Sequence, residues 1–188
     1  MAKQHNQVRI IGGQWRRRLL RFPSSADLRP TPDRVRETVF NWLGQSLEGK
    51  HCLDLFAGSG ALGFEAASRG ARQVVMVEHD RVACAALLAN VEALRAGNIE
   101  VHCRDALSFL DSDQRTFDVV FFDPPYRQGL LPQLLAKIGP HLAAGAVVYL
   151  EAHDVPQIPP EYVIARRSRA GQVNYLLLES GDHGGKIQ

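Results

Sequence analysis

From about residue 50 to residue 150, short apolar stretches typical of buried strands alternate with stretches of helical periodicity. Apolar strands that alternate with helices indicate a mostly parallel sheet whose two faces are both covered by helices. The sequence therefore predicts an α/β fold for this part of the chain. The strand-like stretches are residues 52–56, 73–78, 99–103, 117–122 and 146–151, and the shorter helical stretches are residues 61–68, 106–110 and 131–138.

Both ends of the chain depart from this alternation. Residues 8–20 predict two short strands around a Gly-Gly turn, and after a loop Thr31 and Pro32 suit the N-cap and first residue of a helix. Residues 162–168 and 173–179 flank a turn, which predicts an antiparallel hairpin that completes the sheet. We accordingly divide the chain into a basic N-terminal extension, a main domain and a frayed tail, at residues 1–30, 31–180 and 181–188.

A longer helix is predicted between Asp80, a favourable N-cap residue, and Gly97, which marks its end. Its residues are mostly small or apolar. The residues that we expect to face the core are Val82, Ala85, Ala86, Ala89 and Leu94.

Positive charge is concentrated at the N-terminus. The first 40 residues contain nine Lys or Arg and three Asp or Glu, whereas the whole chain has a net charge of only +2. A cationic end on a mildly acidic body predicts that the N-terminal segment binds a polyanion.

Composition and cysteine spacing exclude several classes of protein. A chain of 188 residues with 45% hydrophobic and 22% charged residues is typical of a soluble globular protein. No apolar run approaches the ~18–20 residues of a membrane span, and the N-terminus has no secretory signal. Because Cys52, Cys84 and Cys103 lie far apart in the sequence, we expect neither a disulfide framework nor a zinc site, and we expect a cytoplasmic location.

A glycine-rich turn follows the first strand-like stretch of the alternating region. Gly58, Gly60 and Gly63 fit the pattern G-x-G-x-x-G, and Glu78 ends the next strand 20 positions after Gly58. Glycines let the backbone approach a ligand, and an acid at that distance suits ribose hydroxyls. This pattern alone fits either NAD or S-adenosylmethionine. Asp105 adds a third acid at a strand end and also suits a helix N-cap.

A second motif, Asp-Pro-Pro-Tyr at 123–126, follows the fourth strand-like stretch. Two prolines end the strand and stiffen the loop. Asp123 and the Pro124 carbonyl then supply two acceptors for the hydrogens of an exocyclic amine. The Tyr126 ring can stack on the base that carries the amine.

These motifs resemble known enzymes. Asp-Leu-Phe-Ala-Gly-Ser-Gly at 54–60, followed by the motif at 123–126, resembles the S-adenosylmethionine-dependent amino-methyltransferases of nucleic acids. Arg-Ile-Ile-Gly-Gly-Gln-Trp-Arg at 9–16 and the segment 29–43, which begins Arg-Pro-Thr-Pro-Asp-Arg-Val-Arg-Glu, resemble the RsmD family more closely. The resemblance runs from about Val8 to the terminal hairpin. It departs at Arg16-Arg17-Arg18, where a glycine between basic residues is expected.

The resemblance implies a Rossmann-like class I methyltransferase fold and methyl transfer from S-adenosylmethionine to the N2 amine of a guanine in bacterial small-subunit (16S) ribosomal RNA. It also implies S-adenosylhomocysteine as the product and 16S rRNA or the small ribosomal subunit as the partner. We expect a monomer that needs no metal and binds no membrane.

The resemblance also assigns roles to residues. We expect Asp123 to orient the amine and to stay ionised beside a sulfonium, because the opposite charge offsets desolvation. The catalytic residues would be Asp123, Pro124, Pro125 and Tyr126. The cofactor-binding residues would be Asp54, Phe56, Gly58, Ser59, Gly60, Glu78, Asp105 and Ala106. Beyond what the resemblance implies, the N-terminal charge predicts that RNA is bound by Arg9, Arg16, Arg17, Arg18, Arg34 and Arg36. Arg34 and Arg36 would be phosphate contacts or would flank the active site.

Three other functions stay open on the sequence. The motif at 123–126 also serves adenine-N6 methyltransferases, although 188 residues leave no separate target-recognition domain. The glycine pattern also fits a nicotinamide-dependent oxidoreductase, which would need a proton donor near the cofactor. A non-catalytic RNA-binding module is the third, but it would have little use for an acidic, proline-rich amine site.

Overall fold

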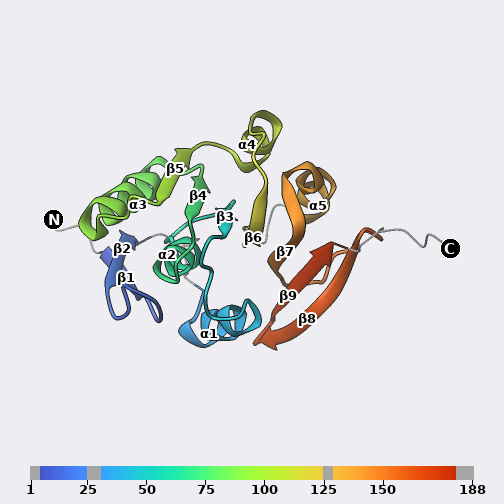
Figure 1. Ribbon diagram of the computed structural model, residues 1–188, viewed down its shortest axis with the longest axis horizontal. Helices are drawn as coiled ribbons and strands as arrows, with labels where there is room; N and C mark the ends of the chain where they lie inside the picture. Colours follow the sequence, from blue (N-terminus) through green and yellow to red (C-terminus); the bar gives the residue numbers. More distant parts are fainter. Residues whose placement is uncertain (1–4, 25–30, 125–128, 181–188) are drawn as a thin grey trace.

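The computed structural model describes residues 5–24, 31–124 and 129–180 of the chain (Figure 1). None of the described helices is long and apolar enough to cross a membrane. The helices are α1 (Asp33–Trp42), α2 (Ala61–Ser68), α3 (Arg81–Leu94), α4 (Ala106–Ser112), α5 (Leu131–Ile138) and the short η2 (Gly139–His141). The strands are β1 (His5–Arg9), β2 (Leu19–Pro23), β3 (His51–Asp54), β4 (Gln73–Glu78), β5 (Ile99–Cys103), β6 (Phe117–Phe122), β7 (Leu142–Ala152), β8 (Tyr162–Ala170) and β9 (Val173–Ser180).

Seven strands form one sheet in the order β5-β4-β3-β6-β7-β9-β8. Neighbours from β5 to β7 pair in parallel, and β9 runs antiparallel to both β7 and β8. This confirms the predicted, mostly parallel sheet with its C-terminal hairpin. We call the edge at which the parallel strands end the carboxyl edge, and the opposite one the amino edge. The chain order reverses at β3, and ligands of open α/β sheets bind at the carboxyl edge beside such a reversal.

Helices cover both faces of the sheet (Figure 1). Helices α1, α2 and α3 pack on one face, and α4 and α5 pack on the other. Alternate residues of each strand serve the two cores. In β4, for example, Val74 and Met76 belong to the first core and Val75 and Val77 to the second, all fully buried. This burial on both faces explains the continuous apolar runs in the sequence.

Strands β1 and β2 form an N-terminal hairpin, as predicted, but most of the segment 8–20 in which we predicted its strands is the loop between them. The hairpin packs on the main body of the protein. Leu20 and Phe22 of β2 are buried in the first core. Asn90 of α3 satisfies the backbone of Arg21 twice: its Oδ1 accepts from the Arg21 N–H at 3.1 Å, and its Nδ2 donates to the Arg21 carbonyl at 2.8 Å. The hairpin is therefore held by core contacts as well as by polar ones.

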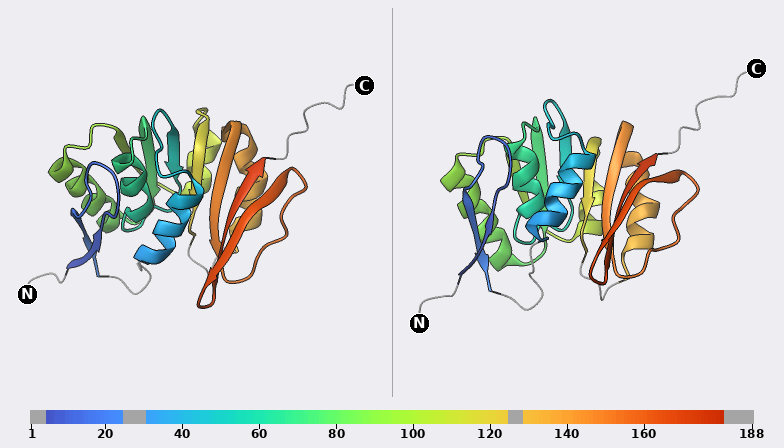
Figure 2. Two further views of the ribbon diagram at one scale, coloured as in Figure 1. Left: turned by 60° about the horizontal axis from the view of Figure 1, so that its bottom comes forward. Right: turned by 90° about the horizontal axis from the view of Figure 1, so that it is seen from below.

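The loop between β1 and β2 lies against the C-terminal half of α2. The Ile11 N–H donates to Glu65 Oε2, and the Trp15 N–H donates to Ser68 Oγ, both at 2.9 Å. Helix α2 begins at the carboxyl edge, directly after β3, and ends at the amino edge. The loop is consequently at the amino edge, whereas the turn between β8 and β9 is at the carboxyl edge (Figure 2).

The predicted inward face of α3 is mostly wrong. Val82 is 55% exposed, and Ala85 and Ala89 are also exposed. Because the helix is small or apolar on nearly every side, its periodicity does not define one face. The polar Asn90 turns inward because the backbone of β2 supplies partners for its amide. The residues of α3 that are buried are Ala83, Cys84, Leu87 and Asn90.

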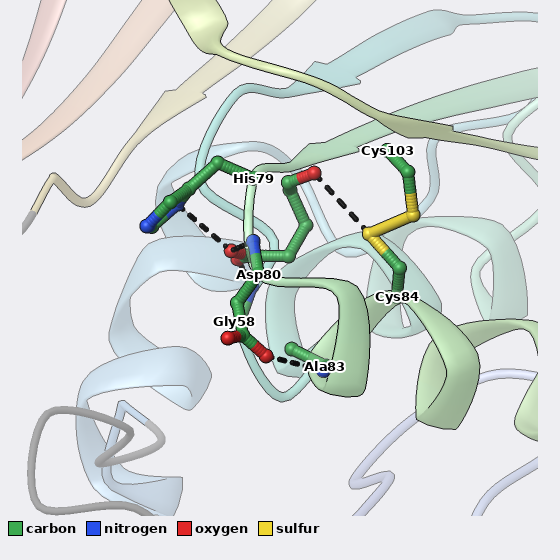
Figure 3. The surroundings of a disulfide bond; sticks show 7 residues. Gly58, His79, Asp80, Ala83, Cys84 and Cys103 are labelled. Carbon is green, nitrogen blue, oxygen red and sulfur yellow. Dashed lines mark hydrogen bonds and ion pairs between the residues drawn. A yellow bond between two sulfur atoms is a disulfide. The ribbon is translucent and has the colours of Figure 1, made fainter.

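One disulfide is present among the described residues, although the cysteine spacing had led us to expect no disulfide framework. The structure joins Cys84, in the first turn of α3, to Cys103, at the end of β5, with their Cα atoms 5.9 Å apart (Figure 3). Cys52 is free and buried. Sequence spacing did not reveal the pair because the packing of α3 against β4 and β5 brings together two residues that are 19 positions apart.

Candidate active site

Five carboxylates lie at the carboxyl edge, each at or just beyond the end of one of five neighbouring strands. We predicted four of them. We did not predict Glu151, although it also lies at the end of a strand-like stretch, as the predicted acids do. Such a row suits a ligand rich in hydroxyl and amino groups, and it disfavours a pyrophosphate because like charges repel. In the order β5, β4, β3, β6 and β7, the acids are Asp105, Glu78, Asp54, Asp123 and Glu151.

The glycine turn leads from β3 into α2 at this edge. Gly58 and Gly60 have positive φ angles of 52° and 79°, which glycine adopts without strain. A Cβ on Gly60 would lie 2.6 Å from the Phe64 ring, so a larger residue would not fit. The Ala57 N–H donates to the Val77 carbonyl at 3.0 Å, which holds the turn against β4.

Glu78, at the end of β4, fixes the turn from the other side. Its Oε2 accepts from the Gly58 N–H at 2.9 Å and its Oε1 from the Asp80 N–H at 2.8 Å. His79 Nδ1 lies 3.1 Å from Oε1. Each carboxylate oxygen has two lone pairs, so Glu78 keeps acceptor capacity for ligand hydroxyls.

Asp54, at the end of β3, has one carboxylate oxygen that accepts no hydrogen bond from the described residues. Its Oδ2 accepts from the Gly63 N–H at 3.1 Å, whereas Oδ1 is buried and has no partner among the described residues. Burial raises the pKa of Asp54 to about 7, against the effect of the Gly63 hydrogen bond. An unsatisfied buried oxygen of this kind suits an amino group of a ligand, which would also favour the ionised form.

This pKa predicts a stability effect for Asp54→Asn. Asp54 ionises near pH 4 in the unfolded chain and near pH 7 in the folded one. Between these pH values the unfolded chain has already released this proton and the folded chain still holds it, so the wild type loses stability as pH rises from about 4 to 7. Without ligand, we expect the variant to be more stable than the wild type at pH 8, by up to roughly 4 kcal/mol, and equal to it near pH 4.

Urea unfolding at several pH values measures this difference. Asp111→Asn is the matched control, because the Asp111 side chain is 61% exposed and should give no comparable trend. A difference for Asp54→Asn that did not change with pH would contradict the expectation.

The other predicted cofactor residues lie around the same edge. Asp105 Oδ1 accepts from the Ser108 N–H at 2.9 Å, which confirms it as the N-cap of α4 and holds its pKa below the usual range. Asp105 is exposed, Phe56 is half-buried, and Ser59 and Ala106 are buried.

Asp123 lies directly beyond β6, next to a second acid and a hydroxyl. The Thr31 hydroxyl is 3.4 Å from Asp123 Oδ2 and 3.2 Å from Glu151 Oε1, and the Tyr149 hydroxyl donates to Glu151 Oε1 at 2.6 Å. Burial, together with the charges of Glu151 and Asp54, raises the pKa of Asp123 well above its ordinary value. The ionised Asp123 that we predicted therefore requires a nearby positive charge.

The rest of the amine-binding motif is described in part. Pro124 is buried, and Pro125 and Tyr126 lie outside the described residues. Among the described residues, no group of three or more His, Cys, Asp or Glu is arranged to hold a metal ion. Sequence reasoning missed Thr31 as a site residue, because it was interpreted only as a helix cap.

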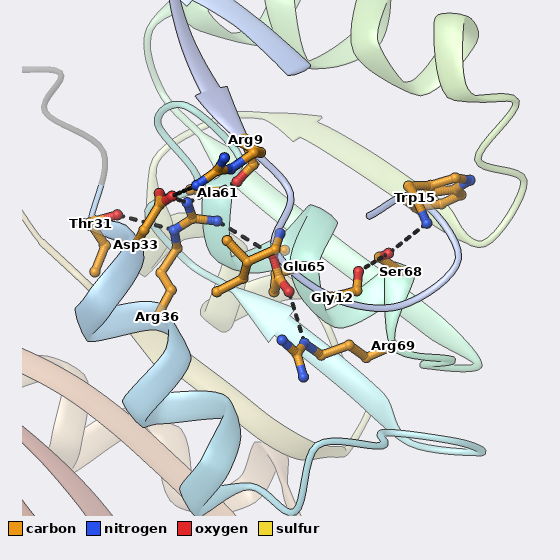
Figure 4. Close-up of polar contacts among 12 residues, drawn as sticks. Arg9, Gly12, Trp15, Thr31, Asp33, Arg36, Ala61, Glu65, Ser68 and Arg69 are labelled. Carbon is orange, nitrogen blue, oxygen red and sulfur yellow. Dashed lines mark hydrogen bonds and ion pairs between the residues drawn. The ribbon is translucent and has the colours of Figure 1, made fainter. Parts of the chain in front are cut away.

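Arg36, which we predicted as an RNA contact, is instead a fully buried structural residue (Figure 4). Its guanidinium donates to the carbonyls of Thr31 and Arg9 and pairs with Asp33 and Glu65. With no exposed surface, it is no longer among the RNA-binding candidates. The sequence signal was misleading because charged residues are rarely buried unless they are paired.

The remaining arginines are exposed but lie in two places. Arg9 pairs with Asp33 at 3.0 Å, close to the N-terminal end of α1 and therefore to Thr31, and Arg34 lies in the first turn of the same helix. The loop at 16–18 is at the amino edge, on the far side of α2 (Figure 2). The structure thus places only two of the five exposed candidates near the carboxyl edge.

The sheet order, the glycine turn and the acids at the strand ends define a Rossmann-like fold of the class I methyltransferase type. Residues 8–179 match the model of the family described as Conserved hypothetical protein 95, and the chain belongs to this family. This confirms the resemblance to the RsmD family.

Curated relatives and solved structures agree with this assignment. The chain is 44% identical over 183 residues to Ribosomal RNA small subunit methyltransferase D of Escherichia coli (strain K12), covering 95% of this chain and 92% of the relative. The protein of the same name from Haemophilus influenzae is 41% identical, with 93% and 94% covered. A solved Escherichia coli structure, provisionally named a methyltransferase, has a TM-score of 0.85 at 44% identity and covers 93% of this chain and 98% of its own.

Proposed function

We propose that this enzyme transfers a methyl group from S-adenosylmethionine to the exocyclic N2 amine of a guanine in small-subunit ribosomal RNA. The observation that carries the proposal is the position of Asp123 and Pro124 beyond β6, beside β3, whose Asp54 precedes the glycine turn. The two relatives named as ribosomal RNA small subunit methyltransferases support the substrate class.

The carboxyl edge fits the cofactor on two grounds. Asp54 Oδ1 is a buried acceptor without a partner among the described residues, and it would hold the amino group of the methionine part. Glu78 and Asp105 would accept from the ribose hydroxyls and the adenine amine, respectively. When bound, S-adenosylmethionine supplies an electrophilic methyl carbon on a positively charged sulfur.

Asp123 and the Pro124 carbonyl would accept the two hydrogens of the guanine amine and so orient its nitrogen for in-line transfer. The lone pair of this nitrogen is delocalised into the ring, so orientation supplies much of the rate. A cation near Asp123 would oppose the burial that raises its pKa, and the ionised carboxylate could then accept a proton after transfer.

Thr31 and Glu151 would position Asp123. A hydroxyl has one proton, so Thr31 donates to one of the two carboxylates at a time. A donation to Asp123 favours its charged form, whereas the adjacent Glu151 disfavours it. Because Thr31 lowers the pKa of Asp123 and Glu151 raises it, the positive charge of a bound cofactor would decide whether Asp123 is ionised.

The RNA would reach this edge with its target base extruded, at a cost of a few kcal/mol if the base is paired. Arg9 and Arg34, which are exposed near the N-terminal end of α1, would bind phosphates near the base. Arg16, Arg17 and Arg18 would serve only a substrate large enough to extend to the amino edge. Stacking of the base on Tyr126 and a monomeric enzyme are further parts of the proposal.

The test is methyl transfer from labelled S-adenosylmethionine to 16S rRNA, to small subunits and to DNA, followed by mapping of the modified nucleotide. We expect N2-methylguanine in ribosomal RNA. Label found in DNA, or in adenine, would refute the proposed substrate. Thermal stabilisation by NADH instead of S-adenosylhomocysteine would refute the class of cofactor.

A further inference from the structure

The end of the β8–β9 hairpin that faces the carboxyl edge is strongly basic. Arg166, Arg167 and Arg169 of β8 are all exposed, and residues 166–176 contain no Asp or Glu. The acidic residue of the hairpin, Glu179, is at the opposite end, paired across the strands with Val163. The positive charge is therefore confined to one end.

This basic end lies beside the proposed active site. Ala152, which follows Glu151, is paired across the sheet with Asn174, and Asn174 is paired with Arg169. Since neighbouring strands are about 4.8 Å apart, the Arg169 backbone is roughly 10 Å from that of Ala152. An arginine side chain reaches across much of this distance.

Hydrogen bonds tie the arginines to the segment that follows Glu151. Asn174 Nδ2 donates to the His153 carbonyl at 2.7 Å, and Arg167 Nη2 donates to Asn174 Oδ1 at 3.2 Å. The basic end is thus anchored to the same strand end that carries one of the site carboxylates.

The three guanidinium groups keep donors for a ligand, although Arg166 Nη1 donates to the Ala165 carbonyl at 2.9 Å and Arg167 Nη2 to Asn174 Oδ1. None of them has a carboxylate partner among the described residues, in contrast to Arg9, which pairs with Asp33. In an extended strand, alternate side chains share a face, so Arg167 and Arg169 lie on one face of β8 and Arg166 on the other. Since β8 is the outermost strand of the sheet, both faces of the sheet margin carry positive charge at this end.

The hairpin end is better placed than the N-terminal loop to bind RNA near the target base. The loop at 16–18 lies beyond the C-terminal end of α2, and that helix, with its eight residues, is about 12 Å long. The β8–β9 turn is at the carboxyl edge itself (Figure 2).

We propose that Arg166, Arg167 and Arg169 form a phosphate-binding surface for the RNA strand that carries the target base. RNA as the ligand rests on the proposed function, and the opposite charge of its backbone fits the three unpaired arginines. With Arg9 and Arg34 beyond the other side of the site, the backbone would be bound on both sides of the extruded base. The competing explanation is that the charges only prevent β8 from pairing with another chain.

The experiment compares the triple variant R166Q/R167Q/R169Q with wild type for binding to transcribed 16S rRNA over a range of salt concentrations. Each lost phosphate contact reduces the slope of log K against log salt by about 0.7–0.9. We expect the slope to fall by about 2 and KM for RNA to rise about tenfold or more, with unchanged binding of S-adenosylhomocysteine.

A control is K50Q/R72Q/R95Q, which removes three exposed positive charges at the amino edge, of which Lys50 pairs with Asp118 at 3.4 Å. The control should keep the wild-type slope. An unchanged slope in the hairpin variant, with normal folding by circular dichroism, would overturn the surface and leave the proposed function intact. If the wild type bound RNA with the expected salt dependence, and the hairpin variant bound it with a reduced slope, but the wild type methylated no RNA, the proposed function would fail and the surface would stand.

Discussion

Asp123→Ala is expected to reduce methyl transfer to ribosomal RNA by at least about a thousandfold while leaving the affinity for S-adenosylmethionine within about threefold. The large loss follows because the variant removes both an orienting acceptor and the group that could accept the proton, and such groups contribute about 10²–10⁴-fold each. The affinity should be kept because the contacts proposed for the cofactor come from Asp54, Glu78 and Asp105, on other strands.

Calorimetry of cofactor binding and single-turnover rates measure the two quantities separately. Asp118→Ala is a suitable control, because Asp118 lies in the same strand, β6, at the amino edge, where it accepts from the His51 N–H at 2.8 Å. It should not alter the single-turnover rate. If the cofactor affinity of Asp123→Ala fell in parallel with the rate, Asp123 would belong to the cofactor pocket rather than to the amine site.

Several elements could be predicted to the residue from the sequence. Gln73–Glu78 and Phe117–Phe122 are almost entirely buried, which fits their mostly apolar sequences. Ile99–Cys103 is the edge strand β5, partly exposed along its length, and its apolar and polar residues alternate. Acids at the ends of such strands converge on one edge, because parallel strands all end there. Glu78 was located by its spacing after the glycine turn, Asp123 by its motif and Asp54 by the family resemblance, and the topology explains why all three lie at the same edge.

The features that the sequence did not reveal depend on contacts between distant segments. Asn90 turns inward because β2 docks on it, and Arg36 is buried because four partners surround it. The Cys84–Cys103 disulfide likewise depends on how α3 packs beside β5. Arg36 in particular shows why a count of N-terminal charge overestimated the RNA-binding surface.

The buried position of Arg36 leads to the second large effect, since Arg36→Met is expected to destabilise the fold by about 3–5 kcal/mol. Arg36 joins three segments: α1, the end of β1 through the Arg9 carbonyl at 2.8 Å, and α2 through Glu65 (Figure 4). Its loss leaves buried carbonyls without donors, and only Arg69, at 2.8 Å, still neutralises Glu65. A buried charge that loses one partner is costly because it cannot regain its hydration.

Thermal unfolding should show this as a fall in Tm of roughly 6–20 °C for a chain of this length. Arg34→Met, in the same turn of α1 but exposed, should change stability by less than about 0.5 kcal/mol. Arg36→Lys should also destabilise the fold, since one ammonium group cannot reproduce the planar set of donors. The Arg36 Nε–H also donates to the Thr31 carbonyl at 3.1 Å, and the Thr31 hydroxyl contacts Asp123. An Arg36 variant should therefore also transfer methyl groups more slowly, because Thr31 would no longer hold Asp123 in position. Equal Tm values for Arg36→Met and Arg34→Met would show that the buried network contributes little.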